Sequence, residues 1–235
     1  MKVTIIAFGA HPDDIELRCA GTLIKLAKKG HKIVVVDLTQ GEFGSKGTPQ
    51  KRIGESKKAL NIMGLNFREN LKIPDTNIEI NEENKIKVIN VIRKYKPEIV
   101  FLPYWDDRHP DHANASKLIN EASFYSGLKN IKTDYETFRP VYNIYYMCHY
   151  TFEPTFIVDI SDVFEKKINA INAYKSQFEI NKEMELNDLL KSPFSLENVE
   201  AKDRFYGSLI GVRYGEPFLL KNPVKTSNPI NLLFS

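Results

Sequence analysis

Residues 5–16 of the chain, IIAFGAHPDDIE, decide how its N-terminal part folds. An uninterrupted apolar run is typical of a strand that is buried on both faces, as in parallel sheets. The run stops abruptly at residues 11–14, HPDD, which place a histidine and two adjacent aspartates at the end of the strand. Because neighbouring carboxylates repel each other, we expect a compensating positive charge here, and a metal ion is one candidate.

Strands and helices alternate along the first half of the chain. The apolar runs KIVVVDL (32–38) and PEIVFLP (97–103) predict two further buried strands. Apolar residues at helical spacing predict helices before and after them, and Pro49, Gly64 and Asn81 mark helix ends. This order indicates parallel strand pairing through right-handed crossovers.

The second half of the chain predicts two more strands, in YNIYYMCHY (142–150) and TFIVDI (155–160), followed by helix as far as about Ile210. No linker and no internal repeat divides the 235 residues. The sequence therefore predicts a single Rossmann-like α/β domain, a three-layer sandwich with a mostly parallel sheet. We expect its core over about residues 1–160 and a mostly helical C-terminal extension over about 161–235.

The composition argues against several classes of protein. The 33 basic and 30 acidic side chains nearly balance and the basic residues are scattered, so no nucleic-acid partner is expected. No apolar run approaches the ~18 residues that cross a membrane, and the N-terminal run is better explained as a core strand than as a signal peptide. We therefore predict a cytoplasmic protein without a membrane partner. Cys19 and Cys148 form no CxxC motif and are predicted to be buried free thiols.

A second polar cluster, HPDH at residues 109–112, follows the strand that ends at residue 103. In open parallel sheets ligands bind outside the carboxyl ends of the strands, so both clusters should meet at one edge. His11, Asp14 and His112 could then supply two nitrogens and one oxygen to a divalent metal, with a position left for water, as in catalytic zinc sites. Ferrous iron (Fe2+) or another divalent ion would also bind such a set. Asp13 stands beside these ligands and could accept a proton from the water.

A purely structural explanation competes with the metal site. The same groups could cap helices and pair with Arg18 or Arg108, as aspartates at strand-to-helix turns often do. One cluster alone would not decide between the two explanations, but two clusters at matching sheet positions favour the metal. Glu42 and Asp75 lie on loops that should face the same edge, where either could contact a bound substrate.

Several motifs resemble a known family. AHPDDIE, AGT at residues 20–22, TQGEFGSKGT, RIGESKKAL and HPDH are similar to the PIG-L/LmbE-like zinc-dependent N-deacetylases of N-acetylglucosamine-containing substrates. VDISDVFEKK, AYKSQF and GVRYGEPF are similar to the branch that deacetylates N-acetylglucosaminyl-malate in bacillithiol biosynthesis. The resemblance implies the LmbE/PIG-L-like fold, an amide hydrolase that uses Zn2+, and a homo-oligomer, of which a hexamer is one form.

The resemblance also implies roles for individual residues. The three ligands and the base named above match the family's metal ligands and general base. His109 corresponds to the protonated histidine that stabilises the oxyanion, and Asp111 corresponds to the carboxylate that orients this histidine. Arg52 corresponds to an arginine that contacts the substrate. Arg18 departs from the family, in which a glycine is usual near this position.

The identity of the substrate stays open. Lys175, Arg213 and Arg108 are the candidate cations for the carboxylates of malate. The alternatives are a deacetylase of chito-oligosaccharides or of another N-acetylglucosamine conjugate and, in another class, a non-catalytic, metal-stabilised sugar-binding protein. A dinucleotide-binding enzyme is disfavoured, because the turn after the first strand lacks GxGxxG and carries anions where a pyrophosphate would sit.

Overall fold

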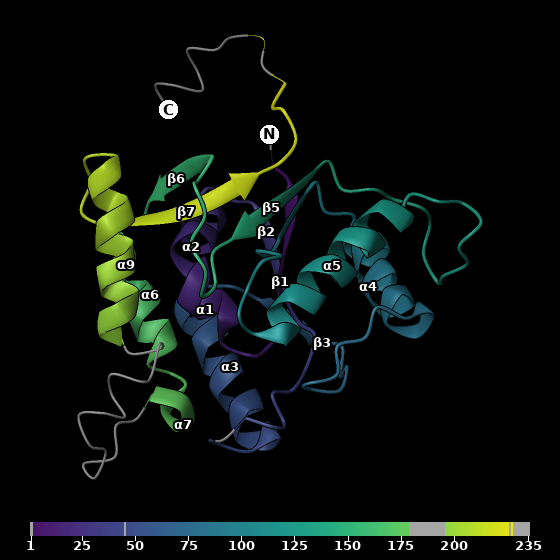
Figure 1. Cartoon of the computed structure of the whole chain (residues 1–235), viewed down its shortest axis with the longest axis horizontal. Helices are drawn as coiled ribbons and strands as arrows, with labels where there is room; N and C mark the ends of the chain where they lie inside the picture. The colour runs from purple at the N-terminus through teal and green to yellow at the C-terminus, as the bar shows by residue number, and fades with distance from the viewer. Residues whose placement is uncertain (1, 45, 179–195, 226, 228–235) are drawn as a thin grey trace.

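A seven-stranded mixed sheet crosses the molecule in the order β3-β2-β1-β4-β5-β7-β6 (Figure 1). The computed structural model describes residues 2–44, 46–178, 196–225 and 227. The first five strands of this order pair in parallel, and β7 runs antiparallel to both of its neighbours. The strands are β1 (Thr4–Gly9), β2 (Lys32–Asp37), β3 (Phe67–Asn70), β4 (Ile99–Pro103), β5 (Tyr142–Tyr146), β6 (Phe156–Asp159) and β7 (Gly215–Leu220).

Helices cover both faces of the sheet. Helices α1, α2, α3 and α6 contribute to the hydrophobic core on one face, and α4 and α5 contribute to the core on the other (Figure 1). The predicted three-layer sandwich with a mostly parallel sheet is therefore confirmed. The helices are α1 (Asp14–Arg18), α2 (Ala20–Lys28), α3 (Pro49–Met63), α4 (Glu82–Tyr95), α5 (Pro110–Tyr125), α6 (Phe164–Ile171), α7 (Lys175–Phe178) and α9 (Leu196–Leu209).

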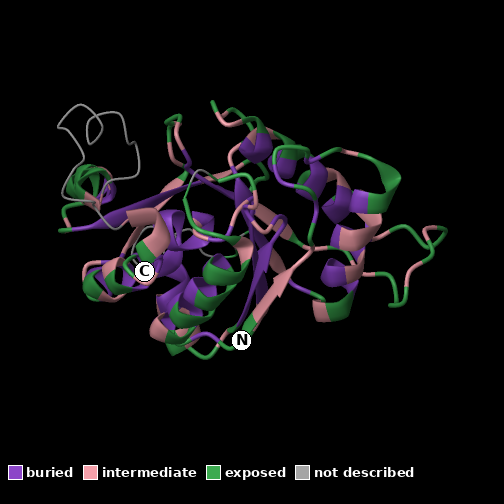
Figure 2. Cartoon of the chain, turned by 90° about the horizontal axis from the view of Figure 1, so that it is seen from below, coloured by how far each residue is buried: buried purple, intermediate pink, exposed green. Residues whose placement is uncertain are grey.

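The apolar run of β1 is continuous because the strand is buried on both faces. Ile5 and Ala7 belong to one core, and Ile6 and Phe8 belong to the other. This alternation follows from the opposite directions of successive side chains in a strand. Figure 2 shows buried strands in the middle of the molecule and exposed residues on the outer sides of the helices.

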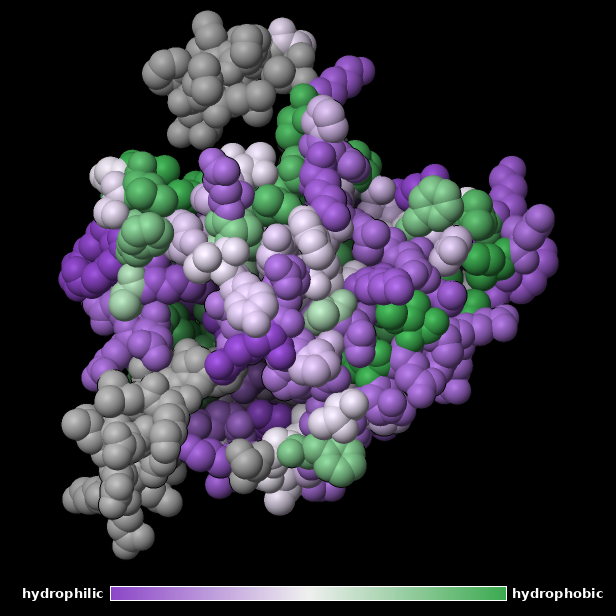
Figure 3. Space-filling model, viewed as in Figure 1, coloured by the Kyte–Doolittle hydropathy of each residue, from purple (hydrophilic) through white to green (hydrophobic). Residues whose placement is uncertain are grey.

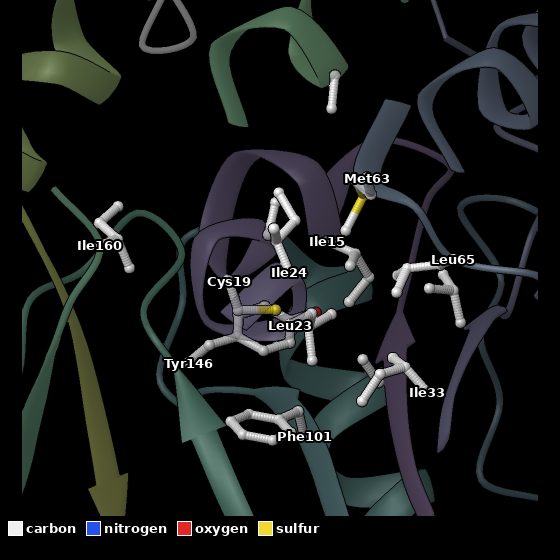
Figure 4. Close-up of a cluster of buried hydrophobic side chains, with 14 of the residues drawn as sticks. Ile15, Cys19, Leu23, Ile24, Ile33, Met63, Leu65, Phe101, Tyr146 and Ile160 are labelled. Carbon is white, nitrogen blue, oxygen red and sulfur yellow. The ribbon is translucent and has the colours of Figure 1, made fainter. Parts of the chain in front are cut away.

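The first of these cores packs α1 and α2 against the sheet. Figure 4 shows Ile15, Cys19 and Leu23 gathered against Phe101 and Tyr146 of the sheet. Both cysteines of the chain are buried and free, which confirms the sequence prediction.

Local sequence signals set the helix ends as predicted. Thr48 caps α3 by accepting a hydrogen bond from the backbone of Lys51, and Pro49 is the first helical residue. Gly64 ends this helix in the left-handed region, with φ of 76°. Asn81 caps α4 through its side-chain oxygen.

Two strands were not predicted from the sequence. β3 is a short edge strand of mostly polar residues, and β7 inserts between β5 and β6. The C-terminal segment therefore completes the sheet in addition to supplying α6, α7 and α9. Part of the helix predicted as far as Ile210, residues 179–195, lies outside the described residues.

None of the described helices is both long and apolar enough to span a bilayer. Figure 3 shows one face of the molecule, on which hydrophilic residues predominate and hydrophobic residues form several separate groups.

Candidate metal centre and active site

The site lies where the carboxyl ends of three adjacent strands meet. β1 is paired with β4, and β4 is paired with β5, so the loops that follow them lie side by side. The chain turns sharply after β1: a Cβ at Gly9 would lie 3.0 Å from the backbone oxygen of His11 and 3.2 Å from Cβ of Asp14. A side chain at position 9 would therefore push the polar cluster away from the strand end.

His11, Asp14 and His112 form a triad in which each residue offers one ligand atom within 4.8 Å of the others. Oδ1 of Asp14 lies 3.2 Å from Nε2 of His112, and its Oδ2 lies 3.6 Å from Nδ1 of His11. The side chains of Asp14 and His112 are almost fully buried, and that of His11 is 13% exposed. The structure thus brings together the three residues that the two motifs were predicted to contribute.

The remaining nitrogen of each triad imidazole is held by a carboxylate. Nε2 of His11 lies 3.1 Å from Asp111, and Nδ1 of His112 lies 3.0 Å from Asp107. When these nitrogens carry the ring proton, the nitrogen that faces Asp14 presents a lone pair. Two imidazole lone pairs and one carboxylate around a common point form a donor set that a divalent cation would complete, and the set suits zinc.

The electrostatics of the triad also favour a positive charge at its centre. Burial disfavours the protonated forms of His11 and His112, but the surrounding carboxylates outweigh burial and hold the pKa of both imidazoles well above the usual value. Burial likewise disfavours ionised Asp14, yet the charge of His112 and hydrogen bonds from both histidines hold the pKa of Asp14 well below its usual range. A proton and a metal cation would therefore compete for the same place.

Asp107 organises the histidines, and the sequence interpretation missed it. Its fully buried carboxylate lies 3.0 Å from Nδ1 of His112 and 2.7 Å from Nδ1 of His149, and it accepts a backbone hydrogen bond from His109. The ring of His149, also missed, stacks on His112 with 5.2 Å between centroids. The available signal was the position of Asp107, two residues before the N-cap of α5. Burial raises the pKa of Asp107, but these hydrogen bonds outweigh burial and hold the pKa far below its usual range.

Asp13 lies beside the triad and has a strained backbone, with φ of 142°. It occupies the N-cap position of α1, but its side chain makes no capping hydrogen bond. Burial raises the pKa of Asp13 to about 7, while the charge of Arg52 opposes the shift and that of Asp14 adds to it. A carboxyl group with a pKa near 7 is suited to accept and return a proton near neutral pH.

Arg52 is buried and is held by residues from two other segments. Its Nη1 donates to the backbone oxygen of Gly41 at 3.0 Å, and its Nη2 donates to Oε1 of Gln177 at 2.7 Å. Gln177 in turn donates to the backbone oxygen of Lys46 at 2.7 Å. The AYKSQF stretch therefore acts through Gln177, which fixes the guanidinium 3.6 Å from Oδ2 of Asp13.

His109 and Asp111 lie in the site, but their contacts differ from the expected ones. The carboxylate of Asp111 was expected to hold protonated His109; in the structure it lies 3.1 Å from Nε2 of His11 and accepts a hydrogen bond from the backbone of Thr76. The backbone N–H of Asp111 donates to Nδ1 of His109, which leaves the ring proton on Nε2. Burial and the charges of His112 and His11 lower the pKa of His109, which favours a neutral ring that donates through Nε2.

A cavity of about 330 Å³ lies in front of these groups. It is lined by the triad and by Asp13, Arg52, Asp75, His109 and Gln177. Its volume lies within the range of small-molecule sites. Glu42 is not among the lining residues, because its carboxylate accepts hydrogen bonds from the backbone of Gln40 and of Asp75 and so joins two loops.

Three of the predicted substrate cations lie away from this cavity. Arg108 lines a separate cavity, and Arg213 lines another one, with its guanidinium 5.2 Å from the ring of Tyr214. Lys175 belongs to α7 but is not among the residues that line the active-site cavity. Of the predicted substrate residues, Arg52 and Asp75 reach the cavity.

Two C-terminal motifs form a buried ionic cluster. Lys167 of VDISDVFEKK lies 2.6 Å from Asp203 and 2.8 Å from Glu216 of GVRYGEPF, and all three side chains are fully buried. Glu216 also accepts hydrogen bonds from the backbone of Gly21 and Thr22 at the start of α2. These motifs therefore hold helices and sheet together and do not face the cavity.

Comparison with known proteins places the chain in a family. Residues 6–123 match the family of GlcNAc-PI de-N-acetylase (PIG-L), and the chain belongs to this family. It is 32% identical over 188 residues to the diacetylchitobiose deacetylase of Thermococcus kodakarensis, covering 74% of this chain and 70% of the relative. It is 26% identical over 186 residues to a probable N-acetyl-alpha-D-glucosaminyl L-malate deacetylase 2 of Bacillus anthracis, covering 72% of this chain and 78% of the relative.

The fold is shared with solved structures. A conserved protein from Thermus thermophilus superimposes with a TM-score of 0.86 and 37% sequence identity, covering 95% of this chain and 97% of that one. The family expected from the N-terminal motifs is thereby confirmed, whereas the comparisons leave its bacillithiol branch as a prediction.

Proposed function

We propose that this chain is a metal-dependent amide hydrolase that removes the acetyl group from an N-acetylglucosamine conjugate. The observation that carries the proposal is a single cavity in which an N, O, N donor set and a carboxyl group with a pKa of about 7 lie side by side. Membership of the PIG-L family and the names of the relatives, which describe deacetylases of N-acetylated sugars, support it. A protein that only binds sugar would have no use for such a carboxyl group beside the donor set.

His11, Asp14 and His112 would hold the cation. When bound, a divalent cation supplies a Lewis acid for the acetyl carbonyl and makes a nearby water more acidic. Asp13 accepts the proton of the attacking water. Nε2–H of His109 donates to the oxygen on which negative charge develops, a contact whose loss typically costs ~2.7–4 kcal/mol of barrier.

The leaving amine must receive a proton before the product departs. His109 has a single ring proton, on Nε2, because its Nδ1 already accepts from the backbone of Asp111. Asp13 holds the proton taken from water and lines the same cavity, so it can return that proton to the amine. We therefore assign both proton transfers to Asp13, with Arg52 at 3.6 Å stabilising its ionised form.

The structure weakens the sequence evidence for malate as the aglycone, the group attached to the sugar. The resemblance that suggested N-acetylglucosaminyl-malate rests partly on VDISDVFEKK and GVRYGEPF, whose Lys167 and Glu216 are buried far from solvent. The relative from T. kodakarensis favours a chito-oligosaccharide equally well. N-acetylglucosaminyl-malate in bacillithiol biosynthesis and diacetylchitobiose are thus the two candidate substrates.

A substrate panel tests the proposal. Purified protein loaded with zinc, or in parallel with ferrous iron, is assayed for amine release from N-acetylglucosaminyl-malate, diacetylchitobiose and free N-acetylglucosamine. One conjugate should exceed the free sugar by more than about tenfold in kcat/KM, because binding energy from the remote group helps to orient the amide. Sugar binding without amine release from any substrate would support the non-catalytic alternative instead.

The assembly and the native metal are further parts of the proposal. Zn2+ suits the donor set of two imidazoles and a carboxylate, and Fe2+ is the second candidate. The family resemblance supports a homo-oligomer, with a hexamer as one form. Metal analysis and light scattering on the same purified sample would test both points.

A further inference from the structure

A second cavity, of about 350 Å³, is lined in part by His149, whose ring stacks on His112 of the metal triad. Three basic side chains line it, Arg18 from α1, Arg108 from the loop after β4, and Lys202 from α9. None of the described residues that line it carries a carboxylate. The described part of its lining is therefore basic.

Arg18 is the residue at which this sequence departs from the family resemblance. It follows Leu17, which lines the active-site cavity, and it is only 6% exposed. Arg108 likewise precedes His109 of the active-site cavity. Adjacent residues of the same two segments therefore line the two cavities. Arg18, a long and buried cation, lies near a position where the family resemblance implies a glycine.

Lys202 lacks the partners that a buried ammonium group needs. Its Nζ is buried and has no hydrogen-bond partner among the residues that the structure describes. The carboxylate of Asp203 lies 3.7 Å away, beyond hydrogen-bond distance, and its other oxygen is bound by Lys167. Burial lowers the pKa of Lys202 to about 8, and Asp203 opposes the shift only in part. Rotation of the flexible Lys202 side chain, which lines the cavity, would bring this ammonium group to an anion there and supply the missing acceptors.

We propose that this second cavity binds the carboxylate or phosphate group of a small anionic molecule, surrounded by Arg18, Arg108 and Lys202. Guanidinium groups bind both kinds of oxyanion in a bidentate manner, and ammonium binds them as a point charge. Neither the family match nor the names of the relatives assigns this site. Sulfate binding is measured at equilibrium without turnover, so the test of this proposal does not depend on the deacetylase activity.

The cavity is connected to the metal triad by hydrogen bonds. His149 lines it, and Nδ1 of His149 lies 2.7 Å from Asp107, which also lies 3.0 Å from Nδ1 of His112. The anion therefore has two possible sources. It is either a charged group of the substrate's own aglycone or a free anion that acts on the site through this chain of contacts.

Kinetics separates these two sources. Sulfate and L-malate are added to assays of diacetylchitobiose, which is neutral, and of N-acetylglucosaminyl-malate, which is anionic. If the anion belongs to the substrate, both additives raise KM for the malate conjugate and leave the neutral sugar unchanged. If it is a free effector, they change kcat for the neutral sugar as well.

Isothermal titration calorimetry with sulfate tests the site itself. Lys202→Gln removes one lining cation, and Arg204→Gln is its matched control, because Arg204 lies on the same helix, is 53% exposed and pairs with Glu200. Lys202→Gln should weaken sulfate about tenfold, the loss expected when one charge-assisted hydrogen bond is removed, while the control binds as the wild type does. Circular dichroism confirms that both variants are folded. Absence of saturable sulfate binding by the wild type, or an equal loss in both variants, would overturn the proposal.

Discussion

Nη2 of Arg52 lies 3.6 Å from Oδ2 of Asp13, although the two residues are far apart in the sequence. Asp13 follows β1, whereas Arg52 belongs to the start of α3 and is held by Gly41 and Gln177. The position and charge of the proposed base therefore depend on four segments of the chain. Residues that never touch the acetyl group should accordingly affect catalysis.

Gly41 offers a sharp test of this dependence. Its φ is +65°, and a Cβ there would lie 1.7 Å from Nη1 of Arg52, so Gly41→Ala must displace the guanidinium. We expect kcat/KM to fall about tenfold or more with metal content unchanged. Gly54→Ala in α3 is the control, because nothing lies within 4 Å of its Cβ. The control should keep full activity and gain ~0.5–1 kcal/mol of stability; equal activity in the two variants would refute the role of Arg52.

Asp107 should control metal affinity through His112. Asp107→Asn removes the carboxylate that holds Nδ1 of His112 and is expected to weaken metal binding ~10–100-fold. Competition with a chromogenic chelator measures this change. Asp106→Asn is the matched control, because Asp106 is the exposed neighbour in the same loop. Unchanged affinity in Asp107→Asn would show that His112 does not bind the metal in the way described.

The buried cluster around Lys167 predicts a large stability effect. Lys167→Met leaves the carboxylates of Asp203 and Glu216 buried without their cation, which should cost ~3–5 kcal/mol of unfolding free energy. Urea denaturation at neutral pH measures the loss. Lys57→Met on the exposed side of α3 should change stability by less than ~0.5 kcal/mol. Similar values for the two variants would mean that the cluster contributes little.

The pH dependence of sulfate binding should reflect the loss of the positive charge of Lys202. Its pKa of about 8 is lowered by burial, so the side chain is charged below this pH and neutral above it. Sulfate affinity should therefore fall as pH rises from about 7 to about 9, and Lys202→Gln should abolish the fall. The charged and titratable groups around Lys202 are Arg18, Arg108, Cys148, His149, Lys167, Asp203 and Glu216.

The proximity of the triad could be predicted from sequence because it depends on topology alone. The HPDD and HPDH motifs follow two strands that a parallel sheet brings together, and no side-chain detail is needed to place them at one edge. Asp107 and His149 could not be predicted in this way. Their hydrogen bonds join residues 42 positions apart, and the loop conformations that bring them together leave no periodic pattern.

The strand β7 escaped prediction for a different reason. It contains Pro217, which argues against a central strand, and the buried charge of Glu216, which interrupts the apolar pattern. The structure accommodates both, because Glu216 is paired with Lys167 and with the start of α2. A sequence pattern reveals a buried strand through its apolar residues, whereas β7 is buried partly through an ion pair.

Acetate release by metal-loaded protein tests the proposed reaction most directly. Wild-type protein and Asp13→Asn are loaded with the same metal, and acetate and free amine are measured from N-acetylglucosaminyl-malate and diacetylchitobiose. The wild type should release equal amounts of both products from at least one conjugate. Asp13→Asn should bind the same amount of metal and turn over ~100–10,000-fold more slowly, because an amide cannot accept the proton. Turnover close to wild type in Asp13→Asn, or no release from either conjugate by fully loaded wild type, would contradict the mechanism.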